Sequence, residues 1–158
     1  MYLLGLDAGT SVIKAALFGR DGRQRAAASR RTTISHPHPA WSESDPETAW
    51  AATTAVIRQV LAEAGVDGAS VSAIGVTGAM IGAWVIDADG RPLRPGILWD
   101  DGRSQPWIEA RQAGDPTFMS RIFASSGSVM QQGCTLPVLR WLLDHEPEVM
   151  AKADCVFG

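Results

Sequence analysis

Basic clusters, cysteines and long apolar runs are all scarce in this chain of 158 residues. The net charge is −3 and no run of Lys and Arg stands out, which argues against an electrostatic nucleic-acid surface. Cys134 and Cys155 lack metal-ligand spacing and a catalytic signature, and two lone thiols favour a reducing compartment. No apolar stretch approaches the roughly 20 residues of a membrane span, and the start of the chain lacks the basic segment of a signal peptide. We therefore expect a cytoplasmic protein without nucleic-acid or membrane partners.

The N-terminal residues predict three antiparallel strands in succession. Residues 2–7 form a nearly continuous apolar run, which is typical of a strand buried on both faces. A second apolar run at 12–19 follows after too few residues for a helical crossover, so the pair should form a hairpin. The Asp-Gly dipeptide at 21–22 predicts a second hairpin turn, and a third strand then runs through 24–34.

A helix and a fourth strand are predicted next. Asp45 is a suitable N-cap and Pro46 a suitable first helical residue, and the helix should run to about Ala64, where Gly65 ends it. Its inner face is predicted to carry Trp50, Thr54, Ile57 and Leu61. Residues 70–78 form a strand that is reached through this helix and should lie parallel to the first. The order predicts an α/β, ribonuclease H-like domain with a mixed sheet flanked by helices.

The second half of the chain changes from strands to helices. Strands are predicted within 81–93 and 96–104, and four helices follow at 105–114, 116–127, 135–146 and 147–153. Residues 153–158 have the pattern of a strand that opens after a helix, and we expect it to lack a pairing partner. This end suggests a piece of a longer protein.

The stretch GLDAGTSVIKAALF at 5–18 places polar groups at the tip of the first hairpin. Backbone N–H groups of a turn with a glycine can bind phosphate, and a strand-end carboxylate can anchor Mg²⁺ beside it. Asp7, Gly9, Thr10, Ser11 and Lys14 supply such groups, whereas the Walker pattern of P-loops is absent. On this motif alone, a plain turn is an equally good interpretation.

Four stretches in this order resemble the FGGY family of carbohydrate kinases, and within it the xylulokinases. They are 5–18, 37–50, 73–104 and 136–154, and together they cover most of the chain. The resemblance implies transfer of the γ-phosphoryl group of ATP to a hydroxyl of a sugar or polyol, with Mg²⁺.

The resemblance also implies roles for individual residues. Asp7 would lie at the metal and phosphate end of the cleft, holding Mg²⁺ through water, while the ATP phosphates would lie along Gly9, Thr10, Ser11 and Lys14. The sugar side of the pocket would be shaped by Met80, Ile81, Asp100, Asp101 and Arg103.

Two departures from the xylulokinase pattern bear on the substrate. Ile81 stands where these kinases usually have a histidine that hydrogen-bonds the sugar, and Asp100 stands where they usually have asparagine. A site that recognises hydroxyls by hydrogen bonding discriminates strongly between substrates, so a ketose other than xylulose, or a polyol, becomes an expected substrate beside xylulose.

Family members are about three times as long, with a second, C-terminal domain. The catalytic base and the adenosine pocket are therefore expected beyond residue 158, and the isolated chain is expected to be inactive. A homodimer is a further expectation from the family. The alternative hypotheses are a non-catalytic sugar- or phosphate-binding module and, with least support, an actin-like ATPase with a protein partner.

Overall fold

The computed structural model describes residues 1–158, which divide into two compact units. Unit 1 comprises Met1–Ile34 and Asp45–Ala79, and unit 2 comprises Ser35–Ser44 and Met80–Gly158. Each unit has its own cluster of buried apolar residues. None of the helices is long and apolar enough to cross a membrane.

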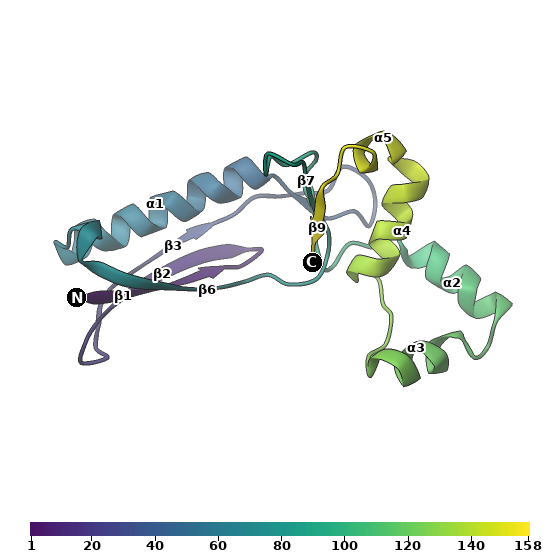
Figure 1. Ribbon diagram of the computed structural model, residues 1–158, viewed down its shortest axis with the longest axis horizontal. Helices are drawn as coiled ribbons and strands as arrows, with labels where there is room; N and C mark the ends of the chain where they lie inside the picture. Colours follow the sequence, from purple (N-terminus) through teal and green to yellow (C-terminus); the bar gives the residue numbers. More distant parts are fainter. The chain divides into compact units, whose positions relative to one another are not determined.

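Unit 1 contains a four-stranded mixed sheet in the order β3-β2-β1-β6 (Figure 1). Its strands are β1 (Tyr2–Ala8), β2 (Val12–Gly19), β3 (Gln24–Arg31) and β6 (Val71–Gly78). The first three pair antiparallel in sequence order, whereas β6 lies parallel to β1. The short 3-10 helix η1 (Gly68–Ser70) leads into β6. The predicted meander and the parallel fourth strand are both confirmed.

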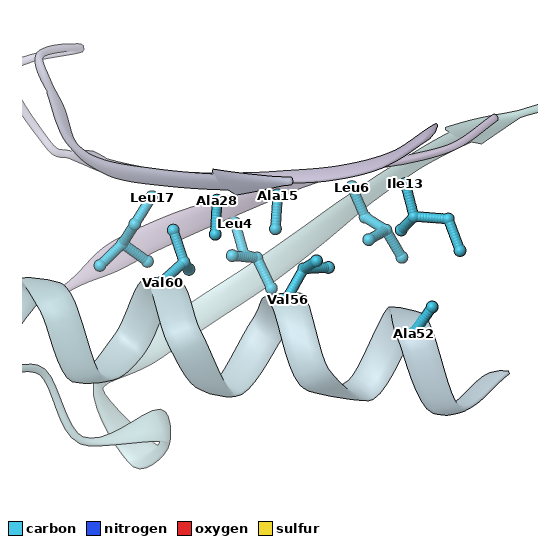
Figure 2. Packing of buried hydrophobic residues seen from close by; sticks show 9 residues of the cluster. All are labelled: Leu4, Leu6, Ile13, Ala15, Leu17, Ala28, Ala52, Val56 and Val60. Carbon is cyan, nitrogen blue, oxygen red and sulfur yellow. The ribbon is translucent and has the colours of Figure 1, made fainter. Parts of the chain in front are cut away.

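Helix α1 (Pro46–Ala64) has the predicted ends. Backbone N–H groups of Glu47 and Thr48 donate to the Asp45 side chain, and Gly65 ends the helix at φ 62°. Figure 2 shows the side of the helix that packs on the sheet, with Ala52, Val56 and Val60 facing the strands.

The predicted inner face of α1 is wrong at its first position. Trp50 is 66% exposed, while Ile57 and Leu61 only border the core. The small and β-branched residues at 52, 56 and 60 form a narrow ridge with a spacing of one helical turn. That ridge fits between Leu4, Leu6, Ile13 and Leu17 on the strands.

The Asp45 cap leads to a stability prediction. Asp45→Ala should lower the free energy of unfolding by about 1 kcal/mol, whereas Arg58→Ala at an exposed mid-helix position should change it by only a few tenths, about 0.3 kcal/mol. The Thr48 hydroxyl, which donates at 2.6 Å, together with the backbone bonds lowers the pKa of the Asp45 carboxyl. Because the folded-state pKa is the lower one, the cap stabilises above the pKa of the unfolded chain, and its contribution disappears as pH falls through the folded value. Urea unfolding of both variants at neutral and acidic pH measures this difference, and a cap effect that persists unchanged in acid would contradict it.

Unit 2 is built around short strands and four helices. The strands are β5 (Glu43–Ser44), β7 (Trp84–Ile86), β8 (Gly96–Ile97) and β9 (Cys155–Phe157), and the unit boundary falls within β4 (Ile34–Ser35). The helices are α2 (Gln105–Gly114), α3 (Phe118–Ser126), α4 (Thr135–His145) and α5 (Pro147–Met150). The core under α4 contains Ala83, Val85, Ile97, Val138 and Leu142.

Two strand predictions in unit 2 need correction. The expectation that the last strand lacks a partner is wrong, because β9 pairs antiparallel with β7, with Trp84 opposite Phe157. The strand predicted within 96–104 is limited to Gly96–Ile97. It ends early because the Asp101 N–H donates to the Leu98 carbonyl, which turns the chain before the charged cluster.

Candidate functional site

The first group of predicted site residues meets at the turn end of the β1–β2 hairpin in unit 1. Asp7 and Lys14 are direct partners in the antiparallel register, and Lys14 Nζ lies 3.6 Å from Asp7 Oδ2. Their side chains are 42% and 60% exposed, respectively. Thr77 on β6 is the parallel partner of Asp7 on the other side. A carboxylate, an ammonium group and a hydroxyl therefore lie side by side on three neighbouring strands, at one end of the sheet.

The turn itself is tight and held in place. A Cβ on Gly9 would lie 2.8 Å from the Val12 carbonyl oxygen, so a larger residue would force the turn open. Thr32, the residue directly after β3, holds the turn in place. Its N–H donates to the Ser11 carbonyl at 3.1 Å, and its hydroxyl donates to the Thr10 carbonyl. The Ser11 side chain is exposed and that of Thr10 is partly buried. The hairpin tip is thus a fixed platform that presents hydroxyls and backbone groups.

A hollow of about 620 Å³ adjoins this cluster within unit 1. Asp7, Lys14 and Thr77 line it together with small residues, among them Gly5 and Gly75. Side chains alternate along a strand, so Asp7 points to the face opposite the one that α1 covers. The volume falls in the range of small-molecule pockets, roughly 300–1,000 Å³.

The donor set at the hairpin tip fits Mg²⁺ only in the company of phosphate. No group of three or more His, Cys, Asp or Glu side chains could hold a metal ion by itself. Mg²⁺ is commonly bound through one or two carboxylates, waters and substrate phosphates. The single accessible carboxylate of Asp7 is compatible with that mode of binding.

In unit 2, three backbone segments cross where Met80 and Ile81 lie. The Gly82 N–H donates to the Gly133 carbonyl at 2.8 Å. Both glycines have positive φ, and a Cβ on Gly133 would overlap the Trp99 carbonyl oxygen. Beside this crossing the side chains of Met80, Ile81 and Trp99 are 71%, 37% and 55% exposed. The predicted sugar-side residues 80 and 81 are therefore accessible on a rigid base.

Asp101 and Arg103 belong to a buried ion network with Glu43, Arg94 and Glu146. Arg103 Nε donates to Asp101 Oδ1 at 2.9 Å, and Arg103 Nη2 donates to Glu43 Oε1 at 2.7 Å. Arg94 completes the network by donating to Glu43 Oε1 at 2.6 Å and to Glu146 Oε2 at 2.8 Å. The side chains of Asp101 and Arg103 have no solvent exposure. Arg103 Nη1 is nevertheless buried without a hydrogen-bond partner, while Asp100 next to Asp101 is exposed.

Two tryptophan rings pack against the Arg103 guanidinium. The Arg103 guanidinium carbon lies 3.8 Å from the centre of the Trp41 ring and 4.9 Å from that of Trp141. The Ser42 N–H donates to Asp101 Oδ2 at 2.7 Å, which ties the loop before β5 to the same carboxylate. This arrangement holds the chain on either side of Asp101 in one conformation, and a direct sugar contact for Asp101 or Arg103 stays a prediction.

Sequence reasoning missed several members of this arrangement. Glu43, Arg94 and Trp141 were not predicted as members of the site. Glu43 lies within a stretch that resembles the kinase family, which was the one available signal. Its pairing with Arg103 spans 60 positions, beyond the reach of local patterns.

Comparison with known proteins identifies the family. Residues 2–158 match the N-terminal domain of the FGGY family of carbohydrate kinases. The chain belongs to this family. An Escherichia coli xylulose kinase is 40% identical over 156 residues, which is 99% of this chain and 31% of that protein. A Methylibium petroleiphilum glycerol kinase is 34% identical, with 97% of this chain and 30% of that kinase covered.

The FGGY fold is confirmed by a solved structure. A xylulose kinase from Rhodospirillum rubrum, known from its crystal structure, is 33% identical in sequence and superposes with a TM-score of 0.89. The match covers 100% of this chain and 32% of the Rhodospirillum rubrum chain. The chain thus spans about a third of the length of the FGGY relatives that it matches. The predicted ribonuclease H-like, sugar-kinase fold is therefore correct.

Proposed function

We propose that the protein carrying this chain transfers the γ-phosphoryl group of ATP to a hydroxyl of a small ketose or polyol. The Asp7–Lys14 pair, open to solvent at the tip of a fixed hairpin, is the observation that carries the proposal. Membership in a family of carbohydrate kinases supports the reaction class, and similarity to xylulose and glycerol kinases supports the two substrate types.

Each residue at the hairpin tip would have a distinct task. The Lys14 ammonium group and the hydroxyls of Thr10 and Ser11 would bind the phosphates of ATP, and Gly9 would let the backbone approach them closely. Asp7 would orient a hydrated Mg²⁺, which neutralises charge on the phosphates when bound. The hairpin holds these groups in place before the nucleotide arrives, so little reorganisation is needed during transfer.

Phosphoryl transfer to a hydroxyl also releases a proton and ADP. The sugar hydroxyl oxygen forms a bond to the γ-phosphorus while the bond to the β,γ-bridging oxygen breaks, and ADP leaves. The hydroxyl proton would pass to a carboxylate that we expect beyond residue 158. We infer that this chain is an N-terminal kinase domain, inactive alone, which works with a C-terminal domain in a cytoplasmic enzyme. A homodimer remains an expectation from the family.

The proposal is tested by ADP release from the longest natural form of the protein. A coupled assay across ketoses and polyols should give turnover of about 1–100 per second on at least one of them. The 158-residue chain at the same concentration serves as the control and should give none. Silence across the panel from a folded, full-length protein would favour a non-catalytic sugar- or phosphate-binding module instead.

A further inference from the structure

Thr77 is a polar residue beside Asp7 that the proposed function leaves without a role. The two are register partners on the parallel strands β6 and β1, and Lys14 and Ser29 continue the same row across β2 and β3. Residues aligned in this way point to one face of a sheet. Figure 2 shows the neighbouring Leu6 facing α1, so the row that contains Asp7 lies on the opposite face. All four side chains of the row line the hollow of about 620 Å³.

The polar row stands beside a floor of small residues. The next row toward the other end of the sheet, on the same face, consists of Gly75, Gly5, Ala16 and Ala27. None of them has a side chain larger than a methyl group, so the polar groups are accessible from the hollow. Thr77 is exposed, and its hydroxyl makes no hydrogen bond within the chain, whereas the hydroxyls of Thr53 and Thr54 on α1 donate to backbone carbonyls.

The end of β6 is held firmly against β1. The Ala79 N–H donates to the Ala8 carbonyl at 3.1 Å, and a Cβ on Gly78 would lie 2.9 Å from the same oxygen. The two strand ends therefore approach too closely for a side chain to lie between them, which fixes the backbone of Thr77 beside Asp7. A preference for strands does not explain the hydroxyl, because valine satisfies that preference equally well.

We propose that Thr77 is a positioning residue for Mg²⁺, and that its hydroxyl accepts a hydrogen bond from a water of the ion that Asp7 orients. This inference rests on the proposed function and deepens it. Mg²⁺ gives up its waters reluctantly and usually keeps several of them, so a carboxylate and a neighbouring hydroxyl can hold it through water. Removal of such outer partners typically lowers metal affinity by about 10- to 100-fold.

Binding of ADP with and without Mg²⁺ tests the inference on the longest natural form of the protein. Calorimetry gives the affinity for ADP in excess Mg²⁺ and in EDTA, and the ratio of the two affinities is the Mg²⁺-dependent gain. Thr77→Val removes the hydroxyl but keeps the shape of the side chain, so it should lower this gain by about tenfold or more and leave the affinity in EDTA unchanged. Thr77→Ser restores the hydroxyl and should return the gain to within about twofold of the wild type.

Ser29→Ala is the matched control. Ser29 is also exposed, lines the same hollow and belongs to the same row, but its register partner is Lys14 and not Asp7. The Mg²⁺-dependent gain of this variant should stay within about twofold of the wild type. A loss as large as that of Thr77→Val would show that any hydroxyl of the row has the same effect, and would overturn the inference.

The outcomes distinguish this inference from the kinase proposal. A gain that is unchanged in Thr77→Val, or equally lowered in Thr77→Val and Thr77→Ser, would overturn the inference and leave the kinase proposal standing. Absence of turnover on every sugar, together with a gain that falls only in Thr77→Val, would contradict the kinase proposal and leave the inference standing. A wild-type protein without any Mg²⁺-dependent gain would overturn the inference, whatever the kinase assay shows.

Discussion

Asp7→Asn is expected to lower kcat for phosphoryl transfer by about 100- to 1,000-fold, the usual loss when one preorganised charge-stabilising group is removed. Asparagine has the same shape, so the hairpin and its register should persist. The negative charge that balances Lys14 at 3.6 Å, and that we propose to orient Mg²⁺, is lost. Because that ion pair is largely exposed, the free energy of unfolding should change by less than about 1 kcal/mol. Steady-state ADP release and urea unfolding of the same preparation measure the two effects.

The matched control is Asp21→Asn at the other end of β2. Asp21 is also an accessible turn aspartate in an ion pair, with Arg25 Nη2 at 2.9 Å from its Oδ1, but it lies away from the hollow. Its kcat should stay within about twofold of the wild type, as expected for a surface substitution. Equal losses in both variants would show that any hairpin carboxylate matters and that Asp7 has no special role. An active Asp7→Asn enzyme would remove the metal-orienting role from this residue.

The hairpin-tip residues and the sugar-side residues differ in how much of their arrangement could be predicted from the sequence. Asp7 and Lys14 were predictable as neighbours because a hairpin loop of only Gly9 to Ser11 leaves little freedom in register. The caps of α1 were predictable for a similar reason, since Asp45 and Gly65 act on adjacent backbone groups. Features that depend on interactions between residues close in the sequence could therefore be predicted from the sequence.

Features that depend on contacts between residues far apart in the sequence could not be predicted from it. The inner face of α1 is decided by the shape of the sheet beneath it, which left Trp50 outside. The partner of β9 is β7, about 70 residues earlier, and no local pattern links them. Likewise, the sequence WDDGR does not indicate which of its two aspartates is buried. Asp101 is the buried one because the Ser42 N–H donates to it and because Glu43 binds its partner Arg103.

The strongest stability effect is expected at Arg103. Arg103→Met should lower the free energy of unfolding by about 3–5 kcal/mol, because it leaves the buried carboxylates of Asp101 and Glu43 without their shared cation. Arg140→Met is the matched control, since Arg140 forms an exposed pair with Asp144 and should cost at most about 1 kcal/mol. Five of the six tryptophans lie in unit 2, so tryptophan fluorescence during urea unfolding reports mainly on this part of the chain.

Arg103→Lys separates a supporting role from a direct role in sugar binding. Lysine keeps the charge but loses the planar fork that joins Asp101 to Glu43 and stacks on Trp41. If Arg103 supports the site through Asp101, the lysine variant should lose stability, and binding of sugar should weaken in step as Asp100 and Trp99 lose their fixed positions. If Arg103 instead contacts the sugar, KM should rise while the free energy of unfolding stays within about 0.5 kcal/mol of the wild type, as for surface changes. Full burial of the Arg103 side chain favours the first result, in which the network sets the shape of the sugar site from behind.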